Sequence, residues 1–168
     1  MKRIFVLIVV FCLFGKLFSL EWVMSNHNTT LTISGEGAMP DFESKDVSGG
    51  KDVPWNQFSE IIDTIVIREG ITSIGANAFA YLFNLKRVYF PESLEVIGYG
   101  AFDWCPKLKD LTFPEGLKRI EDKAFIYSDL VGEVVVPAGT EFNAETVFSA
   151  KTKIDIGKKA VEKTSGSF

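Results

Sequence analysis

The feature that most constrains this chain is an internal repeat with a period of 23 residues. Its clearest marker is a phenylalanine that recurs at this spacing, at Phe79, Phe102, Phe125 and Phe148. Five further apolar columns keep the same period: Ile62, Leu85, Leu108, Val131 and Ile154; Ile65, Val88, Leu111 and Val134; Ile67, Phe90, Phe113 and Val136; Ile71, Leu94 and Leu117; Ile74, Ile97 and Ile120. A repeat this short cannot bury its apolar face alone, so neighbouring copies must stack and share one core.

Each copy contains the pattern of a short strand. In Leu108-x-x-Leu111-x-Phe113 the last two apolar residues alternate, which places them on one face of a strand. A proline follows at Pro91, Pro114 and Pro137, and it ends the strand because it has no N–H to donate. The outward positions form two surface ladders: Val66, Tyr89, Thr112 and Val135, and Thr64, Arg87, Asp110 and Glu133.

The N-terminus has the pattern of a signal peptide. Lys2 and Arg3 precede the apolar run 4–14, which is long enough for a signal-peptide core and short for a membrane span. We expect cleavage near Ser19 or Leu20, with an uncleaved N-terminal anchor as the alternative. Removal of residues 1–19 leaves 15 basic and 22 acidic residues, so the net charge changes from −4 to −7. Such an acidic domain is expected to bind no nucleic acid and not to insert into a membrane.

Both ends of the repeat array must be covered, since an open end exposes apolar core and strand edge. The predicted core of an N-terminal cap consists of Trp22, Leu31, Ile33, Trp55 and Phe58. At the other end the fourth copy decays, because Thr140 and Asn143 occupy apolar columns. We expect a signal peptide at 1–19, a cap at 20–61, three full repeats and one degenerate repeat at 62–157, and a polar tail at 158–168. The segment 45–52 is expected to be an exposed loop.

The repeat pattern L-x-x-L-x-[LF]-P-x-x-[LI]-x-x-I-G-x-x-A-F resembles the BspA-like leucine-rich repeats of bacterial surface proteins. The upstream segment from Leu31 to Phe42, followed by Pro54-Trp55, is similar to the segment that often precedes such arrays. The resemblance covers about residues 22 to 154. It implies an α/β repeat fold, namely a right-handed leucine-rich-repeat solenoid with a short parallel sheet on one face. It also implies export, and for several members adhesion to host matrix proteins or to other cells.

Residues with catalytic chemistry are scarce. His27 is the only histidine, and it lies in a polar segment that is typical of a surface loop. After cleavage Cys105 is the only cysteine, so no intramolecular disulfide is expected; its predicted role is that of a small buried apolar residue, with a reactive thiol as the alternative. Glu69, Glu92 and Glu115 recur at the repeat period and are expected to form a solvated edge. We therefore expect a protein without enzymatic activity, metal or cofactor.

Two surface columns are candidate partner-binding sites. The first lies on the strand face and comprises Arg87, Tyr89, Asp110 and Thr112, with Arg68 flanking the first strand. Tyrosine and arginine are enriched among the residues that dominate protein interfaces. The second is the aromatic column Tyr81, Trp104 and Tyr127, where the resembling family commonly has glycine. This column is either an exposed platform for a protein, a glycan or a second copy of the chain, or a half-buried brace between coils.

The leading hypothesis is an exported, adhesin-like binding module that recognises a protein ligand of the host matrix or a cell surface. The alternative is a structural cell-envelope protein that self-associates through its aromatic column or its solenoid ends. The expected location is secreted or cell-surface, with the periplasm as a further possibility.

Overall fold

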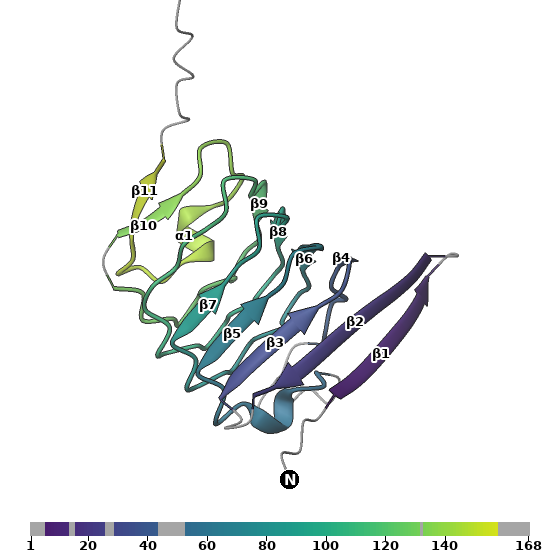
Figure 1. Cartoon of the computed structure of the whole chain (residues 1–168). Coiled ribbons are helices and arrows are strands. Elements are labelled where there is room, and N and C mark those ends of the chain that lie inside the picture. The colour runs from purple at the N-terminus through teal and green to yellow at the C-terminus, as the bar shows by residue number, and fades with distance from the viewer. Residues whose placement is uncertain (1–5, 14–15, 26–28, 44–52, 132, 158–168) are drawn as a thin grey trace, which may run out of the picture.

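The computed structural model describes residues 6–13, 16–25, 29–43, 53–131 and 133–157. Its elements are β1 (Val6–Leu13), β2 (Lys16–Met24), β3 (Thr30–Ser34), β4 (Gly37–Ala38), the 3-10 turn η1 (Asn56–Phe58), β5 (Thr64–Ile67), β6 (Ile71–Ile74), β7 (Arg87–Tyr89), β8 (Val96–Ile97), β9 (Arg119–Ile120), β10 (Glu133–Val136), α1 (Ala144–Val147) and β11 (Lys153–Ile156). Figure 1 shows the chain winding through successive coils, with β3, β5 and β7 side by side on one face.

Parallel pairing between coils confirms the 23-residue register. Ile65 on β5 pairs with Val88 on β7, and β3 continues the same sheet, in the order β1-β2-β3-β5-β7. A second sheet, β4-β6-β8-β9, runs along another side of the stack, where Ile74 pairs with Ile97 and Ile97 with Ile120. Each full coil therefore consists of short extended segments joined by tight turns, and the columns of the sequence become layers of one core.

The phenylalanine column forms a stack of rings through the centre of the molecule. Neighbouring centroids of Phe79, Phe102, Phe125 and Phe148 lie 5.3, 5.3 and 5.5 Å apart, and all four side chains are buried. Trp55 adds a further ring at the N-terminal end, 5.4 Å from Phe79, and its indole N–H donates to the carbonyl of Ala78 at 2.9 Å. The cap and the repeats thus share one continuous aromatic core.

The helical part of the expected α/β fold is nearly absent. The only α-helix among the described residues is α1, which has four residues. Return segments such as 74–81 are too short to nucleate a helix, and left-handed residues interrupt them. Glycines there admit the neighbouring coil, because a Cβ at Gly75 would lie 1.8 Å from the Pro40 carbonyl oxygen. The handedness of the solenoid stays a prediction.

The N-terminal segment extends the stack by one coil. β3 pairs in parallel with β5 and β4 with β6, while β2 runs antiparallel to β3. Burial of Trp22, Leu31, Ile33 and Trp55, and partial burial of Phe58, confirms the predicted apolar cluster. All four residue pairs between β2 and β3 involve residues 21–24, downstream of the predicted cleavage site. The signal peptide itself remains a prediction, and 1–5 and 14–15 lie outside the described residues.

The last two coils depart from the expected pattern. No strand forms at Leu108–Phe113, where a single parallel bridge joins Asp110 to Arg87. In the fourth coil Val131 is exposed and Leu130 is buried instead. Ile154 pairs with Val134 across β10 and β11, so its assignment to the Val131 column was wrong.

Other predictions have mixed outcomes. Thr64, expected to point outward, is buried because β5 lies between β3 and β7. His27, the 45–52 loop and the 158–168 tail lie outside the described residues. Among the described residues no helix has the length and apolar character needed to cross a membrane.

Candidate binding surfaces

Four predicted site residues on the strand face line one depression. Arg87 and Tyr89 lie on β7, Asp110 and Thr112 lie on the next coil, and the depression has a volume of about 330 Å³. The Tyr89 side chain is 55% exposed. Arg87 and Asp110 form a backbone bridge, yet in the described part of the chain neither side chain forms an ion pair. The structure thus places an arginine, a tyrosine and a carboxylate together with their polar groups available to a ligand.

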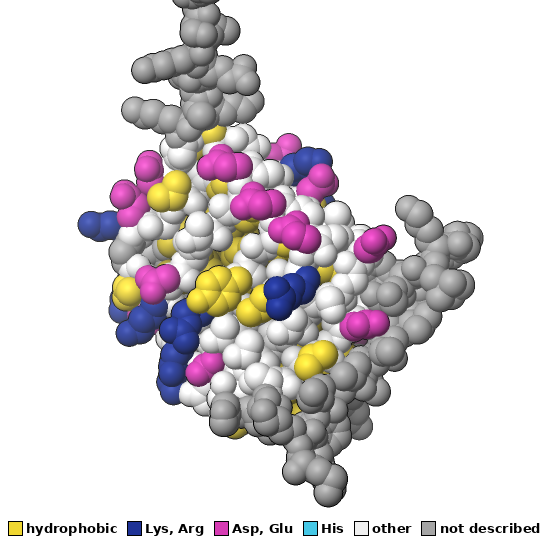
Figure 2. Space-filling view, in the orientation of Figure 1, with side chains coloured by type: hydrophobic (Ala, Val, Ile, Leu, Met, Phe, Trp, Pro, Cys, Tyr) yellow, Lys and Arg dark blue, Asp and Glu magenta, His cyan; other side chains and the backbone are white. Residues whose placement is uncertain are grey.

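The surroundings of this depression are mixed in charge. Figure 2 shows hydrophobic side chains over β5 and β7, with basic side chains on either side and a diagonal row of acidic side chains beside them. Arg68, the fifth predicted strand-face residue, is exposed directly after β5 but does not line the depression. Glu69 accepts hydrogen bonds from the backbone N–H groups of Glu92 and Ser93, and the bond from Glu92 lowers its pKa. This glutamate therefore ties two coils together and is more than a solvated edge.

The aromatic column Tyr81, Trp104 and Tyr127 forms a continuous ring stack on the return side. The rings of Tyr81 and Trp104 are nearly parallel, with centroids 6.3 Å apart. Trp104 and Tyr127 are 4.6 Å apart and tilted by 34°. Exposure increases along the column, from the partly buried Tyr81 to 42% for Trp104 and 58% for Tyr127. The rings brace adjacent coils and also face solvent, so the geometry combines both interpretations of this column.

Backbone conformation explains why glycine suits these positions. Tyr81, Trp104 and Tyr127 have φ angles of 60°, 54° and 56°, in the left-handed region. There Cβ approaches the following carbonyl oxygen, at a cost of about 1–2 kcal/mol for a residue other than glycine. Bulky residues in this conformation are uncommon, and strained backbone is often found at functional sites. The column therefore keeps its rings against a backbone preference that glycine would satisfy.

Charged groups flank the aromatic column. The Lys123 ammonium lies 5.5 Å from the ring centroid of Tyr99, and a hydrogen bond to Tyr99 raises the pKa of this lysine. Burial raises the pKa of Asp103, whose Oδ1 atom is buried without a hydrogen-bond partner. Tyr99 is 40% exposed, so it enlarges the aromatic surface beyond the predicted column. Sequence periodicity missed Tyr99 because its column holds no other aromatic residue.

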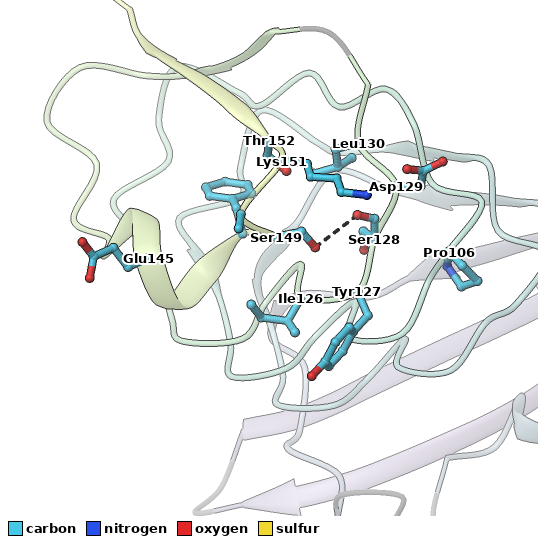
Figure 3. Close-up of a pocket in the computed structure, with 12 residues that line it drawn as sticks. Pro106, Ile126, Tyr127, Ser128, Asp129, Leu130, Glu145, Ser149, Lys151 and Thr152 are labelled. Atoms are coloured by element: carbon cyan, nitrogen blue, oxygen red, sulfur yellow. Dashed lines mark hydrogen bonds between the residues drawn. The ribbon is translucent and has the colours of Figure 1, made fainter.

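A second depression, of about 540 Å³, lies at the C-terminal end of the aromatic column. Tyr127, Leu130 and Phe148 contribute to its lining, together with residues 149–152. Figure 3 shows Tyr127 and Ile126 on one side and Leu130, Lys151 and Thr152 on the other. Between them the Ser149 hydroxyl donates to the Ser128 carbonyl at 3.3 Å. Sequence reasoning did not find this site.

Two buried side chains beside the column have the same role. The Cys105 thiol donates to the Phe79 carbonyl at 3.3 Å, and the Ser128 hydroxyl donates to the Phe102 carbonyl at 3.2 Å. Each group thus bonds to the residue 26 positions earlier, one coil back. Cys105 is buried as predicted, but its role is that of a hydrogen-bond donor. Among the described residues no three His, Cys, Asp or Glu side chains are grouped so that they could hold a metal ion.

Stacked coils with parallel strands, a central phenylalanine stack and an apolar column at each turn define a leucine-rich-repeat protein. A sequence profile of the BspA type leucine-rich repeat region matches residues 51–156 in six copies. The chain belongs to this family, which confirms the resemblance in its repeat pattern. No curated protein matches the chain.

Solved structures of bacterial leucine-rich-repeat proteins are similar to this chain. One, from Eubacterium ventriosum, is 32% identical with a TM-score of 0.62, and the match covers 72% of this chain and 30% of that one. The T. pallidum leucine-rich repeat protein is 18% identical with a TM-score of 0.44, over 73% and 60% of the two chains. A leucine-rich cell surface protein from Faecalibacterium prausnitzii is 18% identical with a TM-score of 0.30, over 79% and 49%. The chain thus spans less than a third of the Eubacterium protein's length.

Proposed function

We propose that this chain is an exported, non-enzymatic binding module that recognises a protein ligand of the host matrix or a cell surface through its strand face. The observation that carries the proposal is the depression shared by Arg87, Tyr89, Asp110 and Thr112. Tyrosine and arginine there combine an exposed ring with a guanidinium that has no ion-pair partner among the described residues. Residues of these types contribute most to protein–protein affinity when a partner desolvates them.

The binding experiment compares the full chain with the Arg87→Ala/Tyr89→Ala double variant on immobilised extracellular-matrix proteins, by surface plasmon resonance. Loss of two such anchors is expected to weaken binding at least about thirtyfold. A matched control, Phe83→Ala/Lys86→Ala, also removes an exposed aromatic ring and a cation, outside the depression. Equal binding by the double variant and the control contradicts the site. Absence of binding to every matrix protein contradicts the ligand class.

Export is supported by the position of the strand pairs. Because β2 contacts β3 only through residues 21–24, removal of residues 1–19 leaves that pairing intact. Leu20, Trp22 and Met24 are buried in the core, so cleavage is expected to leave them in the mature protein. N-terminal sequencing of the exported protein should begin at Leu20 or Glu21. Protease shaving of intact cells then distinguishes a surface location from a periplasmic one.

A second candidate function is self-association within the cell envelope. It is supported by the last coil, where Val131, Val135 and Ile156 are 52%, 49% and 61% exposed. β11 is the outer strand of its two-stranded sheet, and such an edge is open to pairing with another chain. Light scattering over a range of concentrations tests this function, with Ile156→Lys as the variant that blocks the edge. A monomer at all concentrations contradicts self-association.

A further inference from the structure

The depression at the end of the aromatic column exists because the last coil is three residues short. Phe125 and Phe148 form a parallel bridge, so the coils keep the 23-residue spacing to that point. Val134 then pairs with Ile154, only 20 residues later. Three residues are therefore missing between Phe148 and Ile154. In the earlier coils this segment carries the aromatic residue and covers the coil before it.

Register places Ala150 where the next ring of the column would stand. Tyr81, Trp104 and Tyr127 lie two residues after the phenylalanine of their coils, and Ala150 has the same position after Phe148. Both Tyr127 and Ala150 line the depression. The backbone bonds from Tyr81 N–H to Asp103 and from Trp104 N–H to Ile126 have no counterpart from Tyr127 in the described part of the chain. The column thus stops at an open ring with a methyl group in the place of the next one.

Charges at this depression distinguish one class of occupant from others. Asp129 and Glu145 are exposed carboxylates in its lining, against the single ammonium of Lys151. Among the described residues none of the three forms an ion pair. The chain as a whole is acidic, with a net charge of −4. An occupant with positive charge next to its ring would therefore be both attracted and paired at the rim.

The geometry points to a binding site for one aromatic side chain of a protein partner, presented next to lysine or arginine, which stacks on Tyr127 and completes the column. The ring takes the place that Ala150 leaves open, with Leu130 and Phe148 in the apolar part of the lining. Asp129 and Glu145 receive the flanking cation. This site lies apart from the strand-face depression, since the two have no lining residue in common, and it does not depend on the function proposed there.

Nuclear magnetic resonance of the labelled full chain tests the site with short peptides. Acetyl-Lys-Trp-Lys-amide is expected to shift the amide signals of 126–129 and 149–152, with a Kd of about 1–10 mM. Acetyl-Lys-Ala-Lys-amide should bind about three- to tenfold more weakly, because it lacks the stacking ring. Acetyl-Glu-Trp-Glu-amide should also bind more weakly than the lysine peptide. Equal binding of the three peptides overturns the proposal, as does saturable binding of chitotriose or maltotriose at this site in place of the peptide.

Ala150→Tyr supplies the missing ring from the chain itself. It is expected to weaken peptide binding at least about threefold, whereas Ala38→Tyr, at another exposed alanine, leaves the affinity unchanged. If Ala150→Tyr does not fold, Asp129→Asn/Glu145→Gln replaces it and should remove the preference for the lysine peptide over the glutamate peptide. Unchanged affinity in the first variant, or unchanged preference in the second, overturns the proposal. The Arg87→Ala/Tyr89→Ala variant should bind the peptide as the parent does, and loss of binding there assigns the peptide to the strand face.

Discussion

Replacing Tyr127 by glycine and, separately, by alanine measures the backbone strain in the aromatic column. Both substitutions remove the same ring and the same contact with Trp104, 4.6 Å away, so those losses cancel in the comparison. What differs is the fit of each residue to a φ of 56°. Alanine keeps a cost of about 1–2 kcal/mol in this conformation, and glycine avoids it.

The expected difference follows from two opposing terms. Glycine gives up about 0.4–1 kcal/mol because it makes the unfolded chain more flexible. The remaining advantage of Tyr127→Gly over Tyr127→Ala is about 0.5–1 kcal/mol in the free energy of unfolding. At an ordinary backbone position the sign is reversed, and glycine is about 0.5–1 kcal/mol worse than alanine. The sign of the difference is therefore the measurement that matters.

Urea denaturation followed by far-ultraviolet circular dichroism gives both free energies. Phe83 is a matched control, since it is 37% exposed, contacts Tyr81 edge-on and has no positive φ. Alanine should be the more stable substitution at Phe83 and glycine the more stable one at Tyr127. If alanine equals or exceeds glycine at Tyr127, left-handed strain does not explain the family's preference for glycine. The argument that the column keeps its rings against backbone strain then fails.

Three further predictions concern the core and its charges. Phe102→Ala should cost about 3–5 kcal/mol in thermal or chemical unfolding, and Phe148→Ala less, because Phe102 stacks on two phenylalanines and Phe148 on one; equal costs contradict the nearest-neighbour view of the stack. Ser128→Cys should keep more stability than Ser128→Ala, which leaves the Phe102 carbonyl without its donor and loses about 1–3 kcal/mol, as Cys105→Ala should do at the Phe79 carbonyl. Asp103→Asn should stabilise the fold increasingly as pH rises through the folded-state pKa, because burial raises that pKa and the folded state binds the proton more tightly than the unfolded one. Melting temperatures of parent and variant over the acidic range check this sign, and a gap that narrows with rising pH contradicts it.

The repeat could be predicted from the sequence because each column has one packing environment in every full coil. Phe79, Phe102 and Phe125 are each buried between the phenylalanines or tryptophan of adjacent coils, so the same residue type recurs. Periodicity also located the strand-face residues, since alternation decides which side chains point outward. It could not locate the helix content, because left-handed residues end each return segment and their φ angles are not legible in a pattern of apolar residues.

The end of the array could not be predicted by counting at a fixed period. Ile154 stands 23 residues after Val131 and so fits the expected column, although it pairs with Val134. A pattern of alternate apolar residues, Ile154-x-Ile156, like Val134-x-Val136, was the available signal for a coil of 20 residues. The same shift explains why Leu130, one position early, takes the buried place beside Ser128.

Termination of the solenoid and formation of the second depression are one structural event. A last coil of 23 residues would bring a full return segment against Tyr127 and Leu130 and would bury both. Shortening the coil by three residues brings Ser149 directly to Ser128 and leaves Tyr127 as an open ring. An insertion of three residues after Ser149 should therefore cover Tyr127, lower its exposure to solvent and remove peptide binding, while leaving the strand face unchanged. A tyrosine that stays exposed after this insertion would show that some other feature of the fourth coil opens the depression.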